Sequence, residues 1–373
     1  MKVKIAIVIG TRPEAIKLAP VILEMQKSPR LQPVVCLSGQ HSDLVTPIID
    51  FFDISVDFVG VLPENASDLL DRSIYLLQNL KVMLLQHEVS GVCVHGDTAT
   101  ATMAAIAAYY SGLPVFHIEA GLRSFDLSFP WPEEANRRII SEIADLNFAP
   151  TVQASSNLRA ENIDQSKIYV TGNTAIDALL MAEQKIRSPD VQLSKDFELL
   201  VTMHRRENFG EKGVQICRAL EQLSRNSSDI KVKFVLHKNP SARSAATAEL
   251  GGNSNVTLLE SLDYPDFVKL MHSCNLILTD SGGLQEEAPS LGKYVLVLRD
   301  VTERPEGVDL GLSELVGSDQ DKIFAAVMGH YRRWKHKEVS LEASPDKFLS
   351  PYGNGNAATQ IVDRLASFYE RFV

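Results

Sequence analysis

The sequence predicts an α/β protein with two doubly wound, Rossmann-like domains that face a central cleft. Short apolar, β-branched runs alternate with longer segments of helical period, which is typical of a parallel sheet covered by helices. This pattern restarts after a polar segment at residues 185–197 that contains Ser188-Pro189. The length of 373 residues also corresponds to about two domains at roughly 150 residues each.

The first half contains strands and helices in alternation. The expected strands are residues 5–9, 34–37, 92–95, 115–118 and 168–171. The expected helices are residues 14–26, 66–86, 98–110 and 133–143. Because each strand is continuously apolar and short, we expect a sheet buried on both faces. We therefore predict an N-terminal Rossmann-like domain over residues 1–172.

The second half repeats this alternation. Its expected strands are residues 199–202, 232–236, 256–259, 276–278 and 295–298. We predict a C-terminal Rossmann-like domain over residues 173–355. A last helix over 357–372 follows a turn-like Pro/Gly/Asn segment, and we expect the segment 356–373 to pack back on the N-terminal domain.

Composition excludes several classes of protein. Lys and Arg total 37 and Asp and Glu total 47, so the net charge is −10, which disfavours a nucleic-acid-binding surface. No apolar run approaches the ~18 residues needed to span a membrane. The four cysteines are far apart and the histidines are scattered, so we expect reduced core thiols and no metal site. The N-terminus resembles a strand rather than a signal peptide, so we predict a cytoplasmic protein.

Carboxylates follow the strands of the N-terminal half. Asp97 and Glu119 come directly after two of the strands, and Glu133 begins a helix. Ligands of such sheets bind at the carboxyl ends of strands, where a set of carboxylates can remove and return protons. Helix capping is an alternative explanation for Asp97 and Glu133, but not for Glu119. Arg12 and Lys17, near the start of the first helix, favour an anion.

The second half carries groups suited to phosphate. Ser281, Gly282 and Gly283 lie between a strand and a helix, where backbone N–H groups can bind an anion. Glu287 is placed to accept hydrogen bonds from ribose hydroxyls, and Arg304 adds a positive charge at the same edge. Neither a Walker loop nor a GxGxxG fingerprint is present, which disfavours a nicotinamide oxidoreductase. These features predict a two-domain enzyme of nucleotide-sugars.

The combination of motifs resembles the non-hydrolysing UDP-N-acetylglucosamine 2-epimerase family. The matching blocks occur in order along nearly the whole chain. They are Gly10-Thr11-Arg12-Pro13-Glu14-Ala15, His95-Gly96-Asp97-Thr98, His117-Ile118-Glu119-Ala120-Gly121-Leu122-Arg123, Pro130-Trp131-Pro132-Glu133-Glu134-Ala135-Asn136-Arg137, Asn173-Thr174-Ala175-Ile176-Asp177, Asp280-Ser281-Gly282-Gly283-Leu284-Gln285-Glu286-Glu287-Ala288-Pro289 and Thr302-Glu303-Arg304-Pro305-Glu306.

The resemblance implies a GT-B-like fold, a homodimer and a reaction without added cofactor. That reaction interconverts UDP-GlcNAc and UDP-ManNAc through loss of UDP, a 2-acetamidoglucal and re-addition, and it feeds bacterial surface polysaccharide synthesis. The resemblance assigns acid–base and charge-stabilising roles to Asp97, Glu119 and Glu133, with His204 as a substrate and phosphate ligand counted with this catalytic set. It assigns substrate binding to Arg12, Lys17, Phe267, Ser281, Gly282, Gly283, Glu287 and Arg304. No nucleic-acid or membrane partner is expected.

Departures from the family pattern leave alternatives open. Gln40, Arg206 and His237 match residues that bind a regulatory UDP-GlcNAc in some members, but Asn65-Ala66 differs from them. The substrate is also open between UDP-GlcNAc and a UDP-diacetamido uronic acid, and a hydrolysing relative would release ManNAc. A glycosyltransferase would need an acceptor site and not three carboxylates. A non-catalytic UDP-sugar sensor would tolerate loss of all three.

Overall fold

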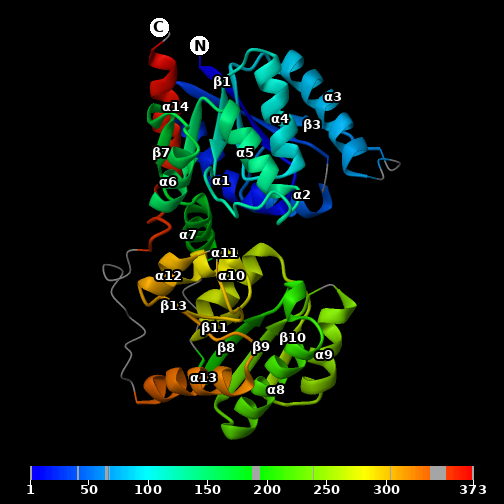
Figure 1. Cartoon of the computed structure of the whole chain (residues 1–373), viewed down its shortest axis with the longest axis vertical. Helices are drawn as coiled ribbons and strands as arrows, with labels where there is room; N and C mark the ends of the chain where they lie inside the picture. Colours follow the sequence, from blue (N-terminus) through cyan, green and yellow to red (C-terminus); the bar gives the residue numbers. More distant parts are fainter. Residues whose placement is uncertain are drawn as a thin grey trace. The chain divides into compact units, whose positions relative to one another are not determined.

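The computed structural model describes residues 2–39, 42–63, 66, 68–186, 194–237, 239–302, 304–336 and 350–371. The chain forms two compact units, Met1–Met181 with Tyr352–Val373, and Ala182–Pro351 (Figure 1). The division falls inside a helix, α7 (Thr174–Ile186), whereas the sequence pointed to 172/173. The reason is that the N-terminal turns of α7 are buried in the first unit. The return to the first unit begins at Tyr352, slightly before the expected residue 356.

The first unit contains a parallel sheet of seven strands in the order β3-β2-β1-β4-β5-β6-β7. The strands are β1 (Val3–Ile9), β2 (Leu31–Leu37), β3 (Phe58–Val59), β4 (Gly91–His95), β5 (Val115–Ile118), β6 (Leu146–Ala149) and β7 (Ile168–Val170). The register aligns Ile7 of β1 with Cys93 of β4. The order reverses direction between β1 and β4, so this pair is the topological switch point of the unit.

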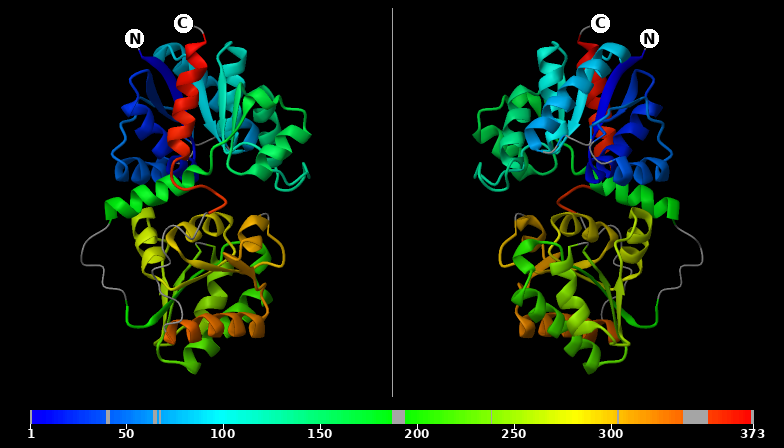
Figure 2. Two further views of the ribbon diagram at one scale, coloured as in Figure 1. Left: turned by 90° about the vertical axis from the view of Figure 1, so that its left-hand side faces the viewer. Right: turned by 90° about the vertical axis from the view of Figure 1, so that its right-hand side faces the viewer.

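Helices cover both faces of this sheet. They are α1 (Arg12–Lys27), α2 (Ser42–Phe51), α3 (Leu69–His87), α4 (Ala99–Tyr110), α5 (Glu133–Ile143), α6 (Val152–Ala160), α7 and α14 (Ala357–Glu370), with a 3₁₀ turn at Gln165–Lys167. The C-terminal helix α14 packs against α1 (Figure 2). On the other face, α3, α4 and α5 bury a cluster that includes Val8, Val94 and Leu80. Alternate strand residues face this layer, as the period of two requires.

The second unit has the same plan with six parallel strands in the order β10-β9-β8-β11-β12-β13. The strands are β8 (Phe197–Thr202), β9 (Ile230–Val235), β10 (Val256–Leu259), β11 (Leu276–Thr279), β12 (Tyr294–Val297) and β13 (Ser313–Leu315). The helices are α8 (Glu211–Asn226), α9 (Pro240–Leu250), α10 (Tyr264–Ser273), α11 (Gly282–Glu287), α12 (Pro305–Asp309) and α13 (Gln320–Lys335), with 3₁₀ turns at Arg206–Asn208 and Ala288–Leu291. Its switch point lies between β8 and β11.

The predicted α/β class with two Rossmann-like domains of GT-B-like type is confirmed. Three strands were not predicted from the sequence. β6 carries a polar residue, Asn147, β3 is two residues long, and β13 contains Glu314, so none forms a continuous apolar run. All four cysteines are free and buried, and burial raises the pKa of each thiol. Within the described ranges, no helix has the length and apolar character needed to cross a bilayer.

Candidate functional site

Glu119 has an unusual backbone conformation. It follows the last residue of β5 directly and has φ = 63°, in the left-handed region that residues with a Cβ rarely adopt. The flanking backbone is held in the sheet, because Gly96 N–H donates to Ile118 O at 3.0 Å and Ala120 N–H donates to Phe148 O at 2.9 Å. Such a conformation costs on the order of 1 kcal/mol or more and is concentrated at functional sites.

Cationic and polar groups surround the Glu119 carboxylate. Lys17 from α1 forms an ion pair with Oε2, and Asn173 Nδ2 donates to the same oxygen at 3.3 Å. The Nε2 atom of His95 lies 3.6 Å from Oε2 and is buried without a hydrogen-bond partner among the described residues. Burial opposes ionisation of Glu119, but Lys17 and His95 outweigh it and hold its pKa well below the usual range. Glu119 is therefore an anion at neutral pH.

A buried glutamate that sequence reasoning did not single out organises the loop after β1. Glu14 is 1% exposed and accepts hydrogen bonds from the backbone N–H groups of Gly10 (2.8 Å) and Thr11 (2.7 Å). It also accepts one from Thr98 Oγ1 at 2.5 Å. Burial raises the pKa of Glu14 despite these donors. Because Gly10 follows β1 and Thr98 follows β4, Glu14 joins the two loops at the switch point. Arg12 lies between Gly10 and Glu14 in sequence and is the first residue of α1.

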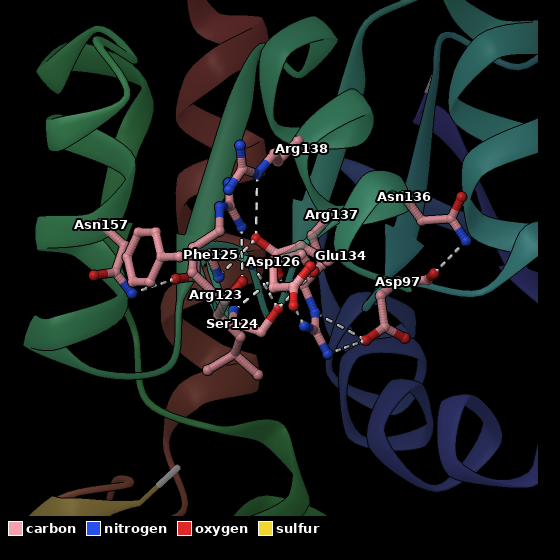
Figure 3. Close-up of polar contacts among 12 residues, drawn as sticks. Asp97, Arg123, Ser124, Phe125, Asp126, Glu134, Asn136, Arg137, Arg138 and Asn157 are labelled. Carbon is pink, nitrogen blue, oxygen red and sulfur yellow. Dashed lines mark hydrogen bonds and ion pairs between the residues drawn. The ribbon is translucent and has the colours of Figure 1, made fainter. Parts of the chain in front are cut away.

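Asp97 is joined to Glu134 through Arg137. The guanidinium of Arg137 donates to Asp97 Oδ2 from Nε (3.0 Å) and Nη2 (2.7 Å), and to Glu134 Oε2 from Nη1 (3.2 Å), as Figure 3 shows. Asn136 Nδ2 donates to the Asp97 carbonyl oxygen at 2.6 Å. The expected capping role of Asp97 is not observed, because Thr98 is the N-cap of α4. Arg137 thus fixes the position of the Asp97 side chain.

Glu133 and Glu134 are adjacent but have opposite environments. Glu134 is fully buried and accepts hydrogen bonds from the backbone N–H groups of Ser124 (2.9 Å) and Phe125 (3.3 Å) and from two arginines (Figure 3). Burial raises the pKa of Glu134, but the hydrogen-bond donors outweigh burial and lower this pKa below its ordinary value. Glu133 has a buried Oε2 with no partner among the described residues. The helix-start explanation therefore leaves this oxygen of Glu133 unaccounted for.

His117 is a structural histidine in β5, two residues before Glu119. It is fully buried, its Nε2 lies 2.9 Å from Gly96 O, and its Nδ1 lies 3.3 Å from Ser141 Oγ. Burial lowers the pKa of His117 to about 4, so its ring is neutral at physiological pH. It supports the Gly96 turn between β4 and Asp97.

In the second unit, Asp280 orients His204. Asp280 is fully buried at the end of β11, and its carboxylate accepts from the backbone N–H groups of His204 (3.1 Å) and Arg205 (2.9 Å) and from Asn208 Nδ2 (3.0 Å). His204 Nδ1 lies 2.8 Å from Asp280 Oδ1. Burial raises the pKa of Asp280, but His204 and the other donors outweigh it, so the pKa lies below its ordinary value. The imidazole is half exposed, so Nε2 is available to a ligand at the β8/β11 switch point.

The Ser-Gly-Gly turn begins α11 at the same switch point. Ser281 is the N-cap, and its Oγ accepts from Leu284 N–H at 3.4 Å. A Cβ on Gly282 would lie 2.6 Å from Cζ of Arg304, so glycine allows this guanidinium to approach the turn. Arg304 Nε also donates to Glu286 Oε1 at 2.8 Å. Glu287 ends α11, and its Oε1 lies over Gly283, 3.6 Å from the position of a Cβ there.

Three further residues that the sequence predicts for substrate binding or regulation lie in the second unit. Phe267 is half-buried on α10. Arg206 and His237 are exposed, and the His237 ring lies 6.5 Å from that of His204. Gln40 lies outside the described residues, so the predicted regulatory set stays a prediction. No group of three or more His, Cys, Asp or Glu side chains in the described part of the chain is arranged to hold a metal ion.

Comparisons with known proteins match this arrangement. The family model described as UDP-N-acetylglucosamine 2-epimerase matches residues 23–366. The UDP-N-acetylglucosamine 2-epimerase of Salmonella typhimurium is 39% identical, covering 98% of this chain and 99% of the relative. The chain belongs to the UDP-N-acetylglucosamine 2-epimerase family.

Solved structures of this epimerase family resemble the chain over its whole length. The UDP-GlcNAc 2-epimerase from Neisseria meningitidis bound to UDP-GlcNAc is 40% identical with a TM-score of 0.86, covering 98% of this chain and 100% of that one. The UDP-GlcNAc 2-epimerase from Methanocaldococcus jannaschii is 32% identical with a TM-score of 0.81, covering 98% and 99%. The predicted family is confirmed.

In this epimerase-family chain, the structure brings together Lys17 and Glu119, and joins Asp97 to the Glu134 cluster. The sequence predicts Lys17 as a substrate and phosphate ligand and does not indicate that it pairs with a carboxylate. Glu14, Glu134 and Asp280 lie inside the motifs, but the sequence assigns them no role. Their position one residue from a strand end or inside a helix N-terminus was the available clue, but their hydrogen-bond partners are distant in sequence.

Proposed function

We propose that this chain is a UDP-GlcNAc 2-epimerase that interconverts UDP-GlcNAc and UDP-ManNAc without an added cofactor. The observation that carries the proposal is the half-buried carboxylate of Glu119 next to Lys17, on a residue with a left-handed backbone, in a chain related to epimerases over nearly its full length. A sensor or a glycosyltransferase has no evident need for an ionised carboxylate kept in this conformation.

The chemistry favours elimination followed by re-addition. The C2 hydrogen of the sugar is not next to a carbonyl group, so direct removal of its proton is unfavourable. Cleavage of the anomeric C1–O bond releases UDP with the bonding electrons and develops positive charge at C1. Loss of the C2 proton then gives the 2-acetamidoglucal. Protonation at the opposite face of C2 and re-addition of UDP at C1 complete the epimerisation.

The environments of the carboxylates suggest different roles. Asp97 is paired with Arg137 and Glu119 with Lys17, so both side chains are placed to stabilise positive charge. Glu133 has a buried oxygen without a described partner and is therefore our candidate to accept the C2 proton. Asp97 remains as the candidate for proton delivery to the other face.

The second unit is our candidate for binding UDP. The Ser281 turn and the Arg304 guanidinium provide donors for the diphosphate, with Glu287 for the ribose and Phe267 for the base. His204, oriented by Asp280, is assigned to the departing phosphate. The Arg304 guanidinium places a positive charge at this edge although the net charge of the chain is −10.

The decisive experiment incubates the protein with UDP-GlcNAc in D₂O and identifies the products by NMR and mass spectrometry. We expect UDP-ManNAc and UDP-GlcNAc that both carry deuterium at C2. Free ManNAc would instead identify a hydrolysing epimerase. If UDP-GlcNAc bound without exchange but a UDP-diacetamido uronic acid exchanged its proton, the protein would be an epimerase of the uronic acid substrate. Binding of both without exchange would identify a sensor.

We also propose that the protein acts as a homodimer in the cytoplasm. The helix α3 carries a face of exposed apolar residues, Leu70 (69%), Ile74 (46%), Val82 (46%) and Leu85 (71%). They lie on one side of a 19-residue helix, and exposed apolar patches of this kind mark interaction sites. A second copy of the chain is the occupant that family resemblance favours. The four reduced, buried thiols support a cytoplasmic location.

Leu85→Glu tests this interface. We expect the sedimentation coefficient to change from that of a dimer to that of a single chain of 41.2 kDa, because the new charge would be buried in the interface without a partner. Leu310→Glu is the control, since Leu310 is exposed in the second unit and its replacement should leave the dimer intact. A monomeric wild-type protein would contradict the proposal, and so would a variant that stays dimeric.

A further inference from the structure

Asn173 connects Glu119 to the C-terminal segment of the chain. It lies between β7 and α7 and is 4% exposed. Its backbone N–H donates to Tyr352 O at 2.7 Å, its Oδ1 accepts from Ala175 N–H at 2.9 Å, and its Nδ2 donates to Glu119 Oε2 at 3.3 Å. One side chain therefore begins a helix, and at the same time binds a carboxylate 54 residues away in sequence.

The C-terminal segment is held tightly at this point. Gly172 has φ = 89°, and a Cβ there would lie 3.2 Å from the Cα of Gly353, so the two backbones cross at van der Waals contact. In the next turn of α7, the Asp177 carboxylate accepts from the backbone N–H groups of Ala357 (3.3 Å) and Ala358 (2.9 Å). These contacts fix the position of Asn173 from the side of residues 352–358.

The donors around Glu119 leave its two oxygens in different situations. Lys17 from α1 and Asn173 both donate to Oε2, and His95 from β4 faces the same oxygen at 3.6 Å. The other oxygen, Oε1, faces the Gly96 turn, where a Cβ on Gly96 would lie 3.9 Å from it. The amide of Asn173 and the ammonium of Lys17 thus orient the carboxylate from two different elements.

We propose that Asn173 is a positioning residue for Glu119, and that it keeps Oε2 engaged so that Oε1 faces the reacting sugar. This inference rests on the proposed epimerase function. A planar amide is suited to this task, because Asn173 is itself fixed at both its backbone and its Oδ1 atom. Lys17 alone has a flexible stem and a charge without directional preference.

Asn173→Asp isolates the hydrogen bond to Glu119. The new carboxyl group keeps the shape and the acceptor for Ala175 N–H, and aspartate is a good residue at a helix start. It replaces the donor that faces Glu119 with an oxygen. Two carboxylates then share one site, which strongly raises one of the two pKa values of the pair. Lys17 and His95 favour the anion at Glu119, so the proton goes to the new carboxyl group, which then donates as the amide does.

The expected result is a distinctive pH dependence of C2 deuterium exchange. At about pH 8 we expect the variant to be roughly 100-fold slower than the wild type, because like charges displace Glu119. As the pH falls to about 6, the ratio of variant to wild-type rate should recover at least about tenfold, because the shared proton restores the hydrogen bond. A role in folding alone would not produce this recovery.

Controls separate this role from stability and from the proposed function. Asp177→Asn weakens the same C-terminal contact without facing Glu119, so we expect a lower melting temperature and an unchanged pH profile. Asn173→Ala removes both acceptor and donor, and should be slow at every pH. A pH-independent rate ratio for Asn173→Asp would overturn the inference. Absence of exchange in the wild type would instead overturn the proposed function.

Discussion

Glu119→Gln is expected to lower the rate of C2 deuterium exchange by about three orders of magnitude while leaving UDP affinity within a few-fold of the wild type. The replacement removes the negative charge that stabilises positive charge at the anomeric carbon. It keeps the length of the side chain, so Lys17 and Asn173 retain a polar neighbour. UDP affinity should persist because the proposed UDP ligands belong to the second unit. Single-turnover exchange measured by NMR and UDP titration by calorimetry give the two quantities.

Asp145→Asn is a matched control for this variant. Asp145 directly precedes β6, and its Oδ2 accepts from Val115 N–H at 3.0 Å, so its carboxylate contacts the end of β5 that is opposite to Glu119. Its replacement should reduce stability slightly and leave exchange unchanged. If Glu119→Gln lost UDP binding together with exchange, Glu119 would be a structural residue and the proposed role would be wrong.

The sequence predicted most strands because burial on both faces leaves a continuous apolar run, as in 115–118. It also indicated Glu119 as a residue to examine, since a carboxylate directly after such a run is costly without a partner. The strand order was not predictable in this way. It depends on pairings such as that of Ile7 with Cys93, which are distant in sequence and leave no local pattern.

The partners of the site residues were also beyond local reasoning. The left-handed conformation of Glu119 depends on hydrogen bonds to β4 and β6, and its charge state depends on Lys17 in α1. A sequence motif shows which residue types occur together, but not which atoms face one another. For Glu133 and Glu134, two identical side chains in one motif differ completely in their surroundings.

This pair provides the second large effect. Glu134→Gln is expected to reduce the stability of the first unit by about 3 kcal/mol, because it leaves the backbone donors of Ser124 and Phe125 and two arginines without the buried anion that accepts from them. For a unit of this size, the melting temperature should fall by about 10 °C. Thermal unfolding measures the fall in melting temperature. Hydrogen exchange in the peptides around Ser124 shows whether stability is lost at that position.

The pH dependence of unfolding gives an independent check on the same variant. The folded state lowers the pKa of Glu134 below its ordinary value of 4.5. The stabilisation by this carboxylate is therefore present above pH 4.5 and is lost as the pH falls through the lowered folded-state pKa. Glu134→Gln should remove this part of the acid sensitivity, so the stability difference between wild type and variant should shrink as the solution is acidified.

Glu133→Gln is the matched comparison, because it makes the same chemical change at the adjacent residue. Its Oε2 has no described partner to lose, so stability should stay within about 0.5 kcal/mol of the wild type. Exchange at C2 should nevertheless fall by at least about 100-fold if Glu133 accepts the proton. The opposite pattern, a stable Glu134→Gln and an unstable but active Glu133→Gln, would exchange the two assignments. A Glu133→Gln variant with full exchange would move the base to Asp97 or Glu119.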